Sequence, residues 1–215
     1  MSLREIVVVD YGMGNLRSVK QALLKVAPAN TRICVSENPD QIMNADAVVF
    51  PGQGAAKACM NALNQIENLK ESVLTATQTK PFLGICMGMQ VLMSHSAENG
   101  GVACLNVYPG EVLAFADQPN WNATHKIPQM GWNQVAQRLD HPLWHAIEDN
   151  SRFYFVHSYF VKPSDDGMTA GRTNFGLNYT SAIAQGKVFA IQAHPEKSAD
   201  AGLQLLRNFC AWNGE

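Results

Sequence analysis

The chain has 215 residues, of which 47% are hydrophobic, and its 16 Lys and Arg and 18 Asp and Glu give a formal net charge of −2. This balance argues against a nucleic-acid-binding protein, which usually presents a strongly basic face, and the composition argues against a disordered chain. No apolar run approaches the roughly 20 residues of a membrane-spanning helix, and no secretory signal is apparent. The sequence therefore predicts a cytoplasmic globular protein that binds neither nucleic acid nor membranes.

The first half of the chain alternates short apolar runs with longer segments of helical character. The predicted strands are residues 6–9, 31–35, 47–50 and 82–85, and the predicted helices are residues 15–26, 55–76 and 87–96. Alternation of this kind is typical of a parallel sheet with helices on both faces, and functional sites in such sheets form at the carboxyl ends of the strands.

The second half differs, because its strand-like runs are joined by short connections. These runs are residues 111–115, 133–136, 152–161, 181–185 and 188–192. Gly186-Lys187 is typical of a hairpin turn, residues 117–126 of a polar surface loop, and residues 199–212 of an amphipathic helix. We see no linker or repeat, so we expect one domain over residues 1–215. Its fold class is α/β, with a mostly parallel sheet flanked by helices and appended antiparallel strands.

The strongest local signal is the pentapeptide Gly84-Ile85-Cys86-Met87-Gly88. It stands where a predicted buried strand passes into a predicted helix, as in a nucleophile elbow with cysteine in place of serine. The tight turn that presents such a nucleophile needs small neighbours two residues away, and the amides at the start of the helix favour the thiolate. Alone, the motif is equally consistent with a buried cysteine between two packing glycines.

A matching base follows another apolar strand, in the sequence His194-Pro195-Glu196. Residues two apart in an extended segment point the same way, so the Glu196 carboxylate can hold one nitrogen of the His194 ring. A thiol nucleophile needs such an oriented base. An isolated tripeptide of this kind is usually an exposed turn, but its occurrence together with the elbow favours a triad of Cys86, His194 and Glu196.

Pro51-Gly52-Gln53-Gly54 ends a further predicted strand. Glycines at such a position let a backbone amide approach a substrate or change its orientation. Together with the amide of Met87, this segment would complete an oxyanion hole beside the cysteine. Alone, such a segment is more often an ordinary turn between a strand and a helix.

The three motifs together resemble those of the class I glutamine amidotransferases, whose pattern is a PGxG oxyanion strand, a GxCxGxQ elbow and a late HPE. Within that family, four further stretches are similar to the glutaminase subunits of imidazole glycerol phosphate synthases. They are residues 10–15 (DYGMGN), 128–133 (PQMGWN), 157–159 (HSY) and 197–198 (KS). The stretch at 128–133 is the most discriminating, since relatives serving other synthases lack it. Gln53 departs from the family pattern, in which an aliphatic residue is common.

The resemblance implies roles for the residues of these motifs. Cys86 would attack the side-chain amide of glutamine, His194 would transfer protons, and Glu196 would orient His194. The oxyanion would be held at Gly52, Gln53 and Met87. A glutamine pocket would be shaped by Gln90, Glu98, His157, Ser158 and Tyr159.

The resemblance also implies a partner in a heterodimer, a (β/α)8-barrel cyclase that receives the ammonia. This cyclase subunit of imidazole glycerol phosphate synthase converts phosphoribulosyl-formimino-carboxamide ribonucleotide (PRFAR) into imidazole glycerol phosphate and aminoimidazole carboxamide ribonucleotide (AICAR) in histidine biosynthesis. The positions that match its interface are Asn15, Met130, Trp132, Tyr154 and Lys197. A Gly52-Gln53-Gly54 peptide able to face toward or away from the oxyanion would make the isolated subunit weak and the complex with ribonucleotide active.

The sequence predicts neither a cofactor nor a metal site. His141 and His145 lack a third ligand, and Gly12-Met13-Gly14 lacks the third glycine of a dinucleotide-binding loop. The triad motifs alone also allow a stand-alone cysteine hydrolase, an inactive scaffold subunit or a glutaminase serving another synthase. Residues 128–133 and Lys197-Ser198 argue against the hydrolase, and the intact triad argues against the scaffold.

Overall fold

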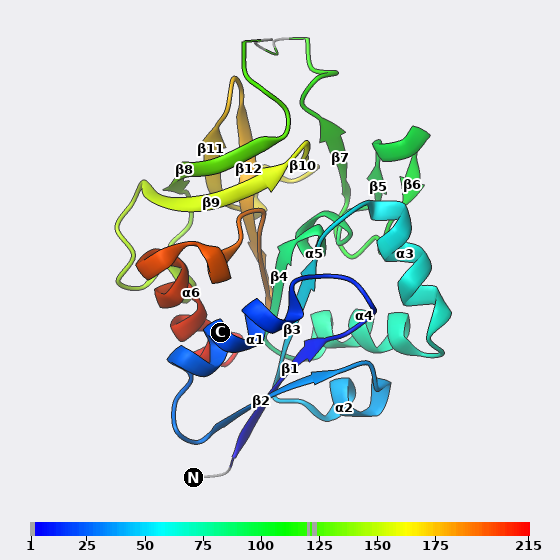
Figure 1. Ribbon diagram of the computed structural model, residues 1–215, viewed down its shortest axis with the longest axis vertical. Coiled ribbons are helices and arrows are strands. Elements are labelled where there is room, and N and C mark those ends of the chain that lie inside the picture. The colour runs from blue at the N-terminus through cyan, green and yellow to red at the C-terminus, as the bar shows by residue number, and fades with distance from the viewer. Residues whose placement is uncertain (1–2, 120, 122–123) are drawn as a thin grey trace.

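The computed structural model describes residues 3–119, 121 and 124–215 (Figure 1). Its helices are α1 (Leu16–Val26), α2 (Pro39–Asn44), α3 (Ala56–Gln65), α4 (Leu69–Thr79), α5 (Met87–Gln90) and α6 (Ala199–Ala211). Its strands are β1 (Arg4–Val9), β2 (Thr31–Ser36), β3 (Ala47–Gly52), β4 (Phe82–Cys86), β5 (His95–Ser96), β6 (Val102–Ala103), β7 (Gly110–Ala114), β8 (Gln129–Gln137), β9 (Ser151–His157), β10 (Tyr159–Pro163), β11 (Thr169–Asn174), β12 (Asn178–Gln185) and β13 (Val188–Ile191). Short 3-10 turns are η1 (Glu98–Gly100), η2 (Pro142–Trp144), η3 (Asp166–Met168) and η4 (Pro195–Lys197).

The described strands form one mixed sheet. Its main path follows the order β2-β1-β3-β4-β13-β12-β10-β7-β5-β6, and β11, β8 and β9 branch from β12. From β2 to β13 each strand runs parallel to its neighbours, whereas β12, β10 and β7 pair antiparallel. The predicted α/β class, a parallel sheet flanked by helices with antiparallel strands appended, is therefore confirmed.

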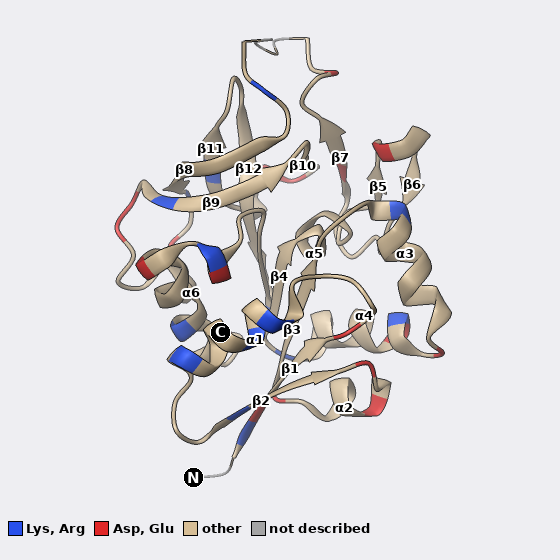
Figure 2. Cartoon of the chain, viewed as in Figure 1, with Lys and Arg blue, Asp and Glu red and all other residues tan. Residues whose placement is uncertain are grey.

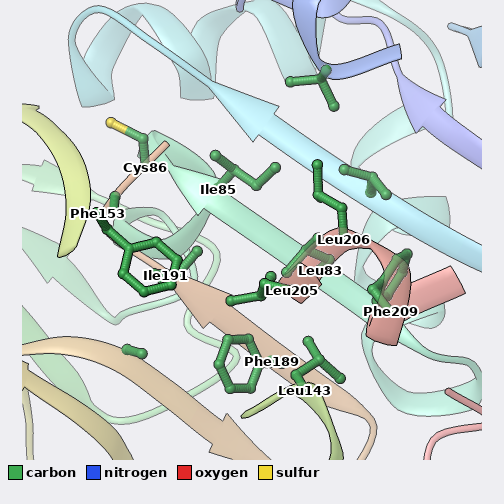
Figure 3. Close-up of a cluster of buried hydrophobic side chains, with 14 of the residues drawn as sticks. Leu83, Ile85, Cys86, Leu143, Phe153, Phe189, Ile191, Leu205, Leu206 and Phe209 are labelled. Atoms are coloured by element: carbon green, nitrogen blue, oxygen red, sulfur yellow. The ribbon is translucent and has the colours of Figure 1, made fainter. Parts of the chain in front are cut away.

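Two apolar layers cover the parallel strands, because side chains alternate between the two faces of a strand. Val8 belongs to the layer that packs against α1 and α6, and Val9 to the layer against α2, α3 and α4. Figure 3 shows part of the first layer, in which Ile85 of β4, Phe189 of β13 and Leu205 of α6 belong to one cluster. Because helices cover both faces of the parallel strands, a ligand-binding site is expected at the carboxyl ends of these strands.

The last two strands form the predicted hairpin. Gln185 of β12 pairs with Val188 of β13, so Gly186 and Lys187 make a two-residue turn. Gly186 has a φ of 58°, which glycine adopts without the cost that a side chain would add.

Two predicted elements are each interrupted in the structure. The helix predicted over residues 55–76 is the pair α3 and α4, separated at Asn68, whose φ of 62° lies in the left-handed region and cannot continue a helix. The strand predicted over residues 152–161 is the pair β9 and β10, separated at Ser158. Neither break is marked by a glycine or proline in the sequence.

The helix predicted over residues 87–96 is wrong beyond Gln90. The carbonyl of Val91 accepts a hydrogen bond from the amide of Leu105 at 2.8 Å, and the carbonyl of Met93 accepts one from Asn106 at 3.0 Å. These long-range bonds replace the helical pattern, and the chain continues into β5. α5 is consequently a single short helix.

Several elements were not predicted, namely α2, β5, β6 and β11. For α2 a signal exists, because the side chain of Asn38 accepts hydrogen bonds from the amides of Asp40 and Gln41, and Pro39 occupies the first helical turn. Asn before Pro is a favourable helix start.

The predicted surface loop at residues 117–126 is only partly described, since residues 120, 122 and 123 lie outside the described residues. Trp121 within it packs against Phe115 and Phe175, with ring centroids 5.2 and 5.5 Å apart. The described part of this loop therefore contributes to the apolar core instead of standing free on the surface.

Candidate active site

Cys86 ends β4 in a strained turn and is followed at once by α5. Its φ of 54° and ψ of −108° are unfavourable for a residue with a side chain. A Cβ on Gly88 would lie 1.9 Å from the carbonyl oxygen of Phe50, and a Cβ on Gly84 would lie 2.9 Å from the Cβ of Ala190. The two glycines of the GxCxG motif thus allow the turn at Cys86 to pack closely against β3 and β13. Since α5 has one turn, its dipole contributes less to the thiolate than a long helix would.

His194 and Glu196 stand just past the end of β13, the parallel neighbour of β4. The Nδ1 of His194 lies 2.9 Å from the Oε1 of Glu196, and the two side chains are 5% and 0% exposed. Because Glu196 accepts from Nδ1, the opposite ring nitrogen, Nε2, is the one available to the thiol of Cys86.

Cys86 and His194 line the same cavity at the ends of the paired strands β4 and β13, and the pKa of His194 depends on both Cys86 and Glu196. Burial lowers the pKa of His194, but interactions with Cys86 and Glu196 outweigh burial and raise that pKa to about 10. A buried imidazolium is stable only beside negative charge. The sulfur and the imidazole predicted to meet from distant parts of the chain are therefore neighbours.

Ser198 links the backbone at His194 to β9 by hydrogen bonds, a role that the sequence analysis did not assign. The amide of Tyr154 donates to the Ser198 hydroxyl at 2.9 Å, and this hydroxyl donates to the His194 carbonyl at 2.6 Å. The amide of His194 in turn donates to the Tyr154 carbonyl at 2.9 Å. This closed set of bonds holds the backbone of His194 in place.

The segment predicted as the oxyanion strand ends β3, with Gly52 in register beside Cys86. A Cβ on Gly52 would lie 2.5 Å from the hydroxyl of Tyr11 and 2.7 Å from the Cβ of Met87, so only glycine fits. The Tyr11 hydroxyl donates to the carbonyl of Pro51 at 2.8 Å. Burial raises the pKa of Tyr11 well above its usual value, so Tyr11 stays a donor. Its role in anchoring this segment was not predicted.

A cavity of about 650 Å³ brings the predicted site residues together. Its walls include Cys86, Met87, His194 and Gln53. They also include every residue predicted for the glutamine pocket: Gln90, Glu98, His157, Ser158 and Tyr159. The cavity is of the size and mixed polarity typical of a site for a small molecule.

Two of these pocket residues are tied to the surrounding fold. Glu98 accepts a hydrogen bond from the amide of Ala56 at 2.6 Å, which places its carboxylate at the start of α3. His157 is buried, and burial lowers its pKa to about 4, so the ring is neutral. Its Nδ1 donates to the carbonyl of Tyr159 at 2.7 Å, and its Nε2 lies 3.2 Å from the hydroxyl of Tyr179.

Four of the five predicted interface residues lie on or beside the β8–β9 ribbon. Trp132 is opposite Tyr154 in register, with ring centroids 6.1 Å apart, and the Nζ of Lys197 lies 6.0 Å from the Tyr154 ring centre. Met130 and Trp132 are 66% and 43% exposed. Lys197 also lines the cavity, so this surface adjoins its mouth. Asn15 lies apart from the ribbon, immediately before α1.

Along the ribbon of the described residues, positions of Lys and Arg are interspersed with positions of Asp and Glu (Figure 2). Within the described residues, no helix combines the length and apolar character needed to cross a membrane. Over residues 3–119, 121 and 124–215, no three His, Cys, Asp or Glu side chains gather closely enough to hold a metal ion. His141 instead accepts from the amide of Leu143 at 3.1 Å and caps η2.

Comparison with known proteins identifies the family. A family model described as glutamine amidotransferase class-I matches residues 7–212. The imidazole glycerol phosphate synthase subunit HisH of Hydrogenovibrio crunogenus is 60% identical over 210 residues, which cover 98% of this chain and 97% of that protein. The HisH subunit of Thiobacillus denitrificans is 52% identical over 216 residues, 97% of this chain and 92% of that protein. The chain belongs to the HisH family of class I glutamine amidotransferases.

Solved structures support the fold of this HisH-family chain. The PurLQS structure from Thermotoga maritima superposes with a TM-score of 0.72 at 19% identity, covering 97% of this chain and 98% of that one. A glutamine amidotransferase from Thermotoga maritima superposes with a TM-score of 0.61 at 18% identity, covering 94% of this chain and 80% of that one. The predicted family, and the prediction of a HisH-type glutamine amidotransferase, are confirmed by the relatives.

The interaction between His194 and Cys86 predicts a change in titration. Replacing the thiol in Cys86→Ala removes one cause of the raised pKa of His194, so this histidine loses its proton at a pH well below the value of about 10. The pKa of an unfolded histidine is about 6.5. Protonation of folded His194 therefore contributes fully to the free energy of unfolding below that pH, and this contribution disappears as the pH rises to about 10. Nitrogen NMR of the imidazole measures the midpoint directly.

The control for this titration is Cys210→Ala, at a buried cysteine on α6. We expect its His194 midpoint to equal that of the unsubstituted chain. An unchanged midpoint in Cys86→Ala would contradict the interaction between sulfur and imidazole.

Proposed function

We propose that the chain hydrolyses glutamine to glutamate and ammonia through a triad of Cys86, His194 and Glu196. We further propose that it acts as a single cytoplasmic domain. The observation that carries the proposal is that a strained, cavity-lining cysteine shares its cavity with the histidine of a buried His–Glu pair. A protonated imidazole beside the sulfur favours the thiolate, which is the nucleophile.

In the first half-reaction, the Cys86 thiolate attacks the side-chain amide carbon of glutamine and the carbonyl oxygen becomes an oxyanion. The amides of Met87 and Gln53 are the proposed donors to this oxyanion, one at the start of α5 and the other past the end of β3. Removing one such donor typically costs about 3 kcal/mol in the activation barrier. His194 then gives its proton to the departing nitrogen, ammonia leaves, and a thioester remains on Cys86.

In the second half-reaction, neutral His194 takes a proton from water, and the resulting hydroxide attacks the thioester carbon. Collapse of the second tetrahedral intermediate expels the Cys86 thiolate and releases glutamate. Glu196 would accept the hydrogen bond from Nδ1 of His194 throughout the cycle, so that only Nε2 exchanges protons. The protons balance, because the imidazolium is restored and the γ-carboxyl group leaves with the proton of the attacking hydroxide, which it then loses to the solvent.

The pocket residues would bind the amino-acid end of glutamine. Glu98 is the proposed partner of the substrate ammonium, because its carboxylate lines the cavity and a cation needs such a partner. Its bond to the Ala56 amide uses Oε2 and fixes the orientation of the carboxylate. Gln90, His157, Ser158 and Tyr159 complete the wall on the side of β10.

The ammonia would pass directly to a partner subunit. Free ammonia is mostly protonated at neutral pH and is then not a nucleophile. The names of the relatives describe them as subunits of imidazole glycerol phosphate synthase. We therefore propose a heterodimer with the (β/α)8-barrel cyclase that makes imidazole glycerol phosphate and AICAR from PRFAR in histidine biosynthesis. The exposed Met130 and Trp132, beside the mouth of the cavity, are the proposed docking surface, together with Asn15, Tyr154 and Lys197.

The partner would also control the glutaminase. Glutamine hydrolysis without a waiting acceptor wastes glutamine, and the peptide between Gly52 and Gln53 is the proposed adjustable part. Tyr11 anchors the preceding carbonyl, that of Pro51, and Gly54 adopts a φ of 88° on the other side. Between these two points only the Gly52–Gln53 peptide needs to turn.

Replacing Cys86 distinguishes synthesis that takes its nitrogen from glutamine from synthesis that takes its nitrogen from added ammonium. In the complex of Cys86→Ala with the cyclase, we expect glutamine-dependent formation of imidazole glycerol phosphate to fall by a factor of at least about 1,000, since no other group can form the thioester. Synthesis from added ammonium salts is expected to continue unchanged. Cys34→Ala, at a half-buried cysteine on β2, is the control and should retain both reactions. Survival of the glutamine-dependent reaction in Cys86→Ala would refute the assignment.

The exposed side chain of Trp132 allows a test of the proposed docking surface. Trp132→Ala is expected to weaken binding to the cyclase by about tenfold or more, because large aromatic side chains dominate interface energies. Titration calorimetry with the purified cyclase measures the dissociation constant. Leu24→Ala on α1, at a side chain 47% exposed compared with 43% for Trp132, is the matched control and should bind normally. Equal effects of the two substitutions would argue against this surface.

Control by the partner predicts a difference in glutamine turnover. The isolated chain is expected to hydrolyse glutamine more slowly, by about tenfold or more, than the complex supplied with its ribonucleotide. Release of glutamate is measured with the chain alone, with the cyclase, and with both cyclase and ribonucleotide. Equal turnover in all three mixtures would show that the oxyanion peptide is not under the partner's control.

A further inference from the structure

The side chain of Gln192 lies at the nucleophile and takes no part in the mechanism above. It follows the end of β13, two residues before His194, and is fully buried. Its Nε2 lies 3.6 Å from the Sγ of Cys86, and its Oε1 lies 3.0 Å from the Nε2 of Gln90. A buried amide whose two ends contact the nucleophile and a pocket residue invites a functional explanation.

The carbonyl of Tyr159 determines which end of the Gln192 amide faces the sulfur. A backbone carbonyl only accepts hydrogen bonds, so the Gln90 side chain, 3.2 Å away, must present its NH₂ group to it. The same NH₂ group reaches Gln192, which must therefore offer its oxygen to Gln90. The NH₂ group of Gln192 is then left pointing at Cys86. The opposite orientation would set two NH₂ groups against each other.

We propose, on the basis of the function proposed above, that Gln192 is a further catalytic residue. Its side-chain N–H donates to the Sγ of Cys86 and stabilises the thiolate, and its orientation is set by the Tyr159 carbonyl through Gln90. Hydrogen bonds with one ionised partner are about twice as strong as those between neutral groups, so this donor favours the thiolate over the thiol.

The proposed hydrogen bond from Gln192 to the sulfur of Cys86 is also consistent with both half-reactions. It is strongest when the sulfur carries full negative charge, which is before attack and again after expulsion from the second tetrahedral intermediate. Gln192 thus assists the departure of Cys86 at the end of the cycle and transfers no proton itself. The Gln192 amide lies 3.6 Å from the sulfur, and the positive charge of a protonated His194 would act on the same sulfur.

Alkylation of Cys86 by iodoacetamide in the full-length chain tests the proposal without glutamine. Gln192→Met keeps the approximate volume and removes the N–H. At pH 7 we expect its Cys86 to react about three- to tenfold more slowly than in the unsubstituted chain, because less thiolate is present. At pH 10 it should react at least as fast, since a less stabilised thiolate is at least as nucleophilic. Peptide mass spectrometry assigns the label to Cys86 among the five cysteines.

Two further variants complete the test. Gln192→Glu keeps an acceptor toward Gln90 but turns an oxygen to the sulfur, and it should slow alkylation at pH 7 further than Gln192→Met. Gln137→Met is the matched control, because the Gln137 amide donates to the carbonyl of Ile147 at 2.9 Å in another part of the chain. We expect the control to react as the unsubstituted chain does.

Each outcome decides the proposal. Slower alkylation at pH 7 with recovery at pH 10 in Gln192→Met supports it, and if Gln192→Met does not fold, the same behaviour of Gln192→Glu supports it. Equal rates at pH 7 in both variants overturn it. Slower alkylation at both pH values also overturns it, because it indicates reduced access to the sulfur. Loss of glutamine-dependent synthesis in Cys86→Ala together with normal alkylation in Gln192→Met would reject the role of Gln192 and leave the proposed function standing.

Discussion

The parallel pairing of β4 with β13 is the contact on which the candidate site depends. Ile85 lies opposite Ile191, so the two strands end side by side at one edge of the sheet. Cys86 follows from one strand and His194 from the other, with Glu196 behind the imidazole. Because β4 and β13 are buried along their length, the core of the molecule positions the proposed nucleophile and the proposed base at or just past the ends of these strands.

Close packing around this edge explains why small residues gather there. β3 pairs with β4 on the other side and brings Gly52 beside Cys86. Gly88 allows the turn of α5 to touch the carbonyl of Phe50, where a methyl group would not fit. Cys86 itself remains in an unfavourable backbone conformation. The cost of that conformation, about 1–3 kcal/mol, is offset by packing on both sides of the turn.

The sequence predicted the features that follow from local pattern. Apolar runs ended by glycine motifs gave the parallel strands and the positions of Cys86 and His194, because such signals lie within a few residues of each other. It did not predict the break at Asn68, where the backbone turns left-handed without a glycine or proline to mark it, or the early end of α5, which depends on hydrogen bonds to residues 105 and 106. The contributions of Ser198 and Tyr11 were missed for the same reason: each acts through a hydrogen bond to backbone far away in the chain.

The anchoring of Pro51 by Tyr11 has a consequence for the kind of control that this architecture permits. The residues of the proposed triad and the walls around Gln90 lie at the edge of the sheet, while the Gly52–Gln53 peptide, in the proposed mechanism, would contact the substrate only as negative charge develops on it. An effector that turns this peptide therefore changes the turnover number and leaves the Michaelis constant nearly untouched. Under the proposed control, glutamine would already be bound when the effector arrives, and activation would not wait for substrate to diffuse in.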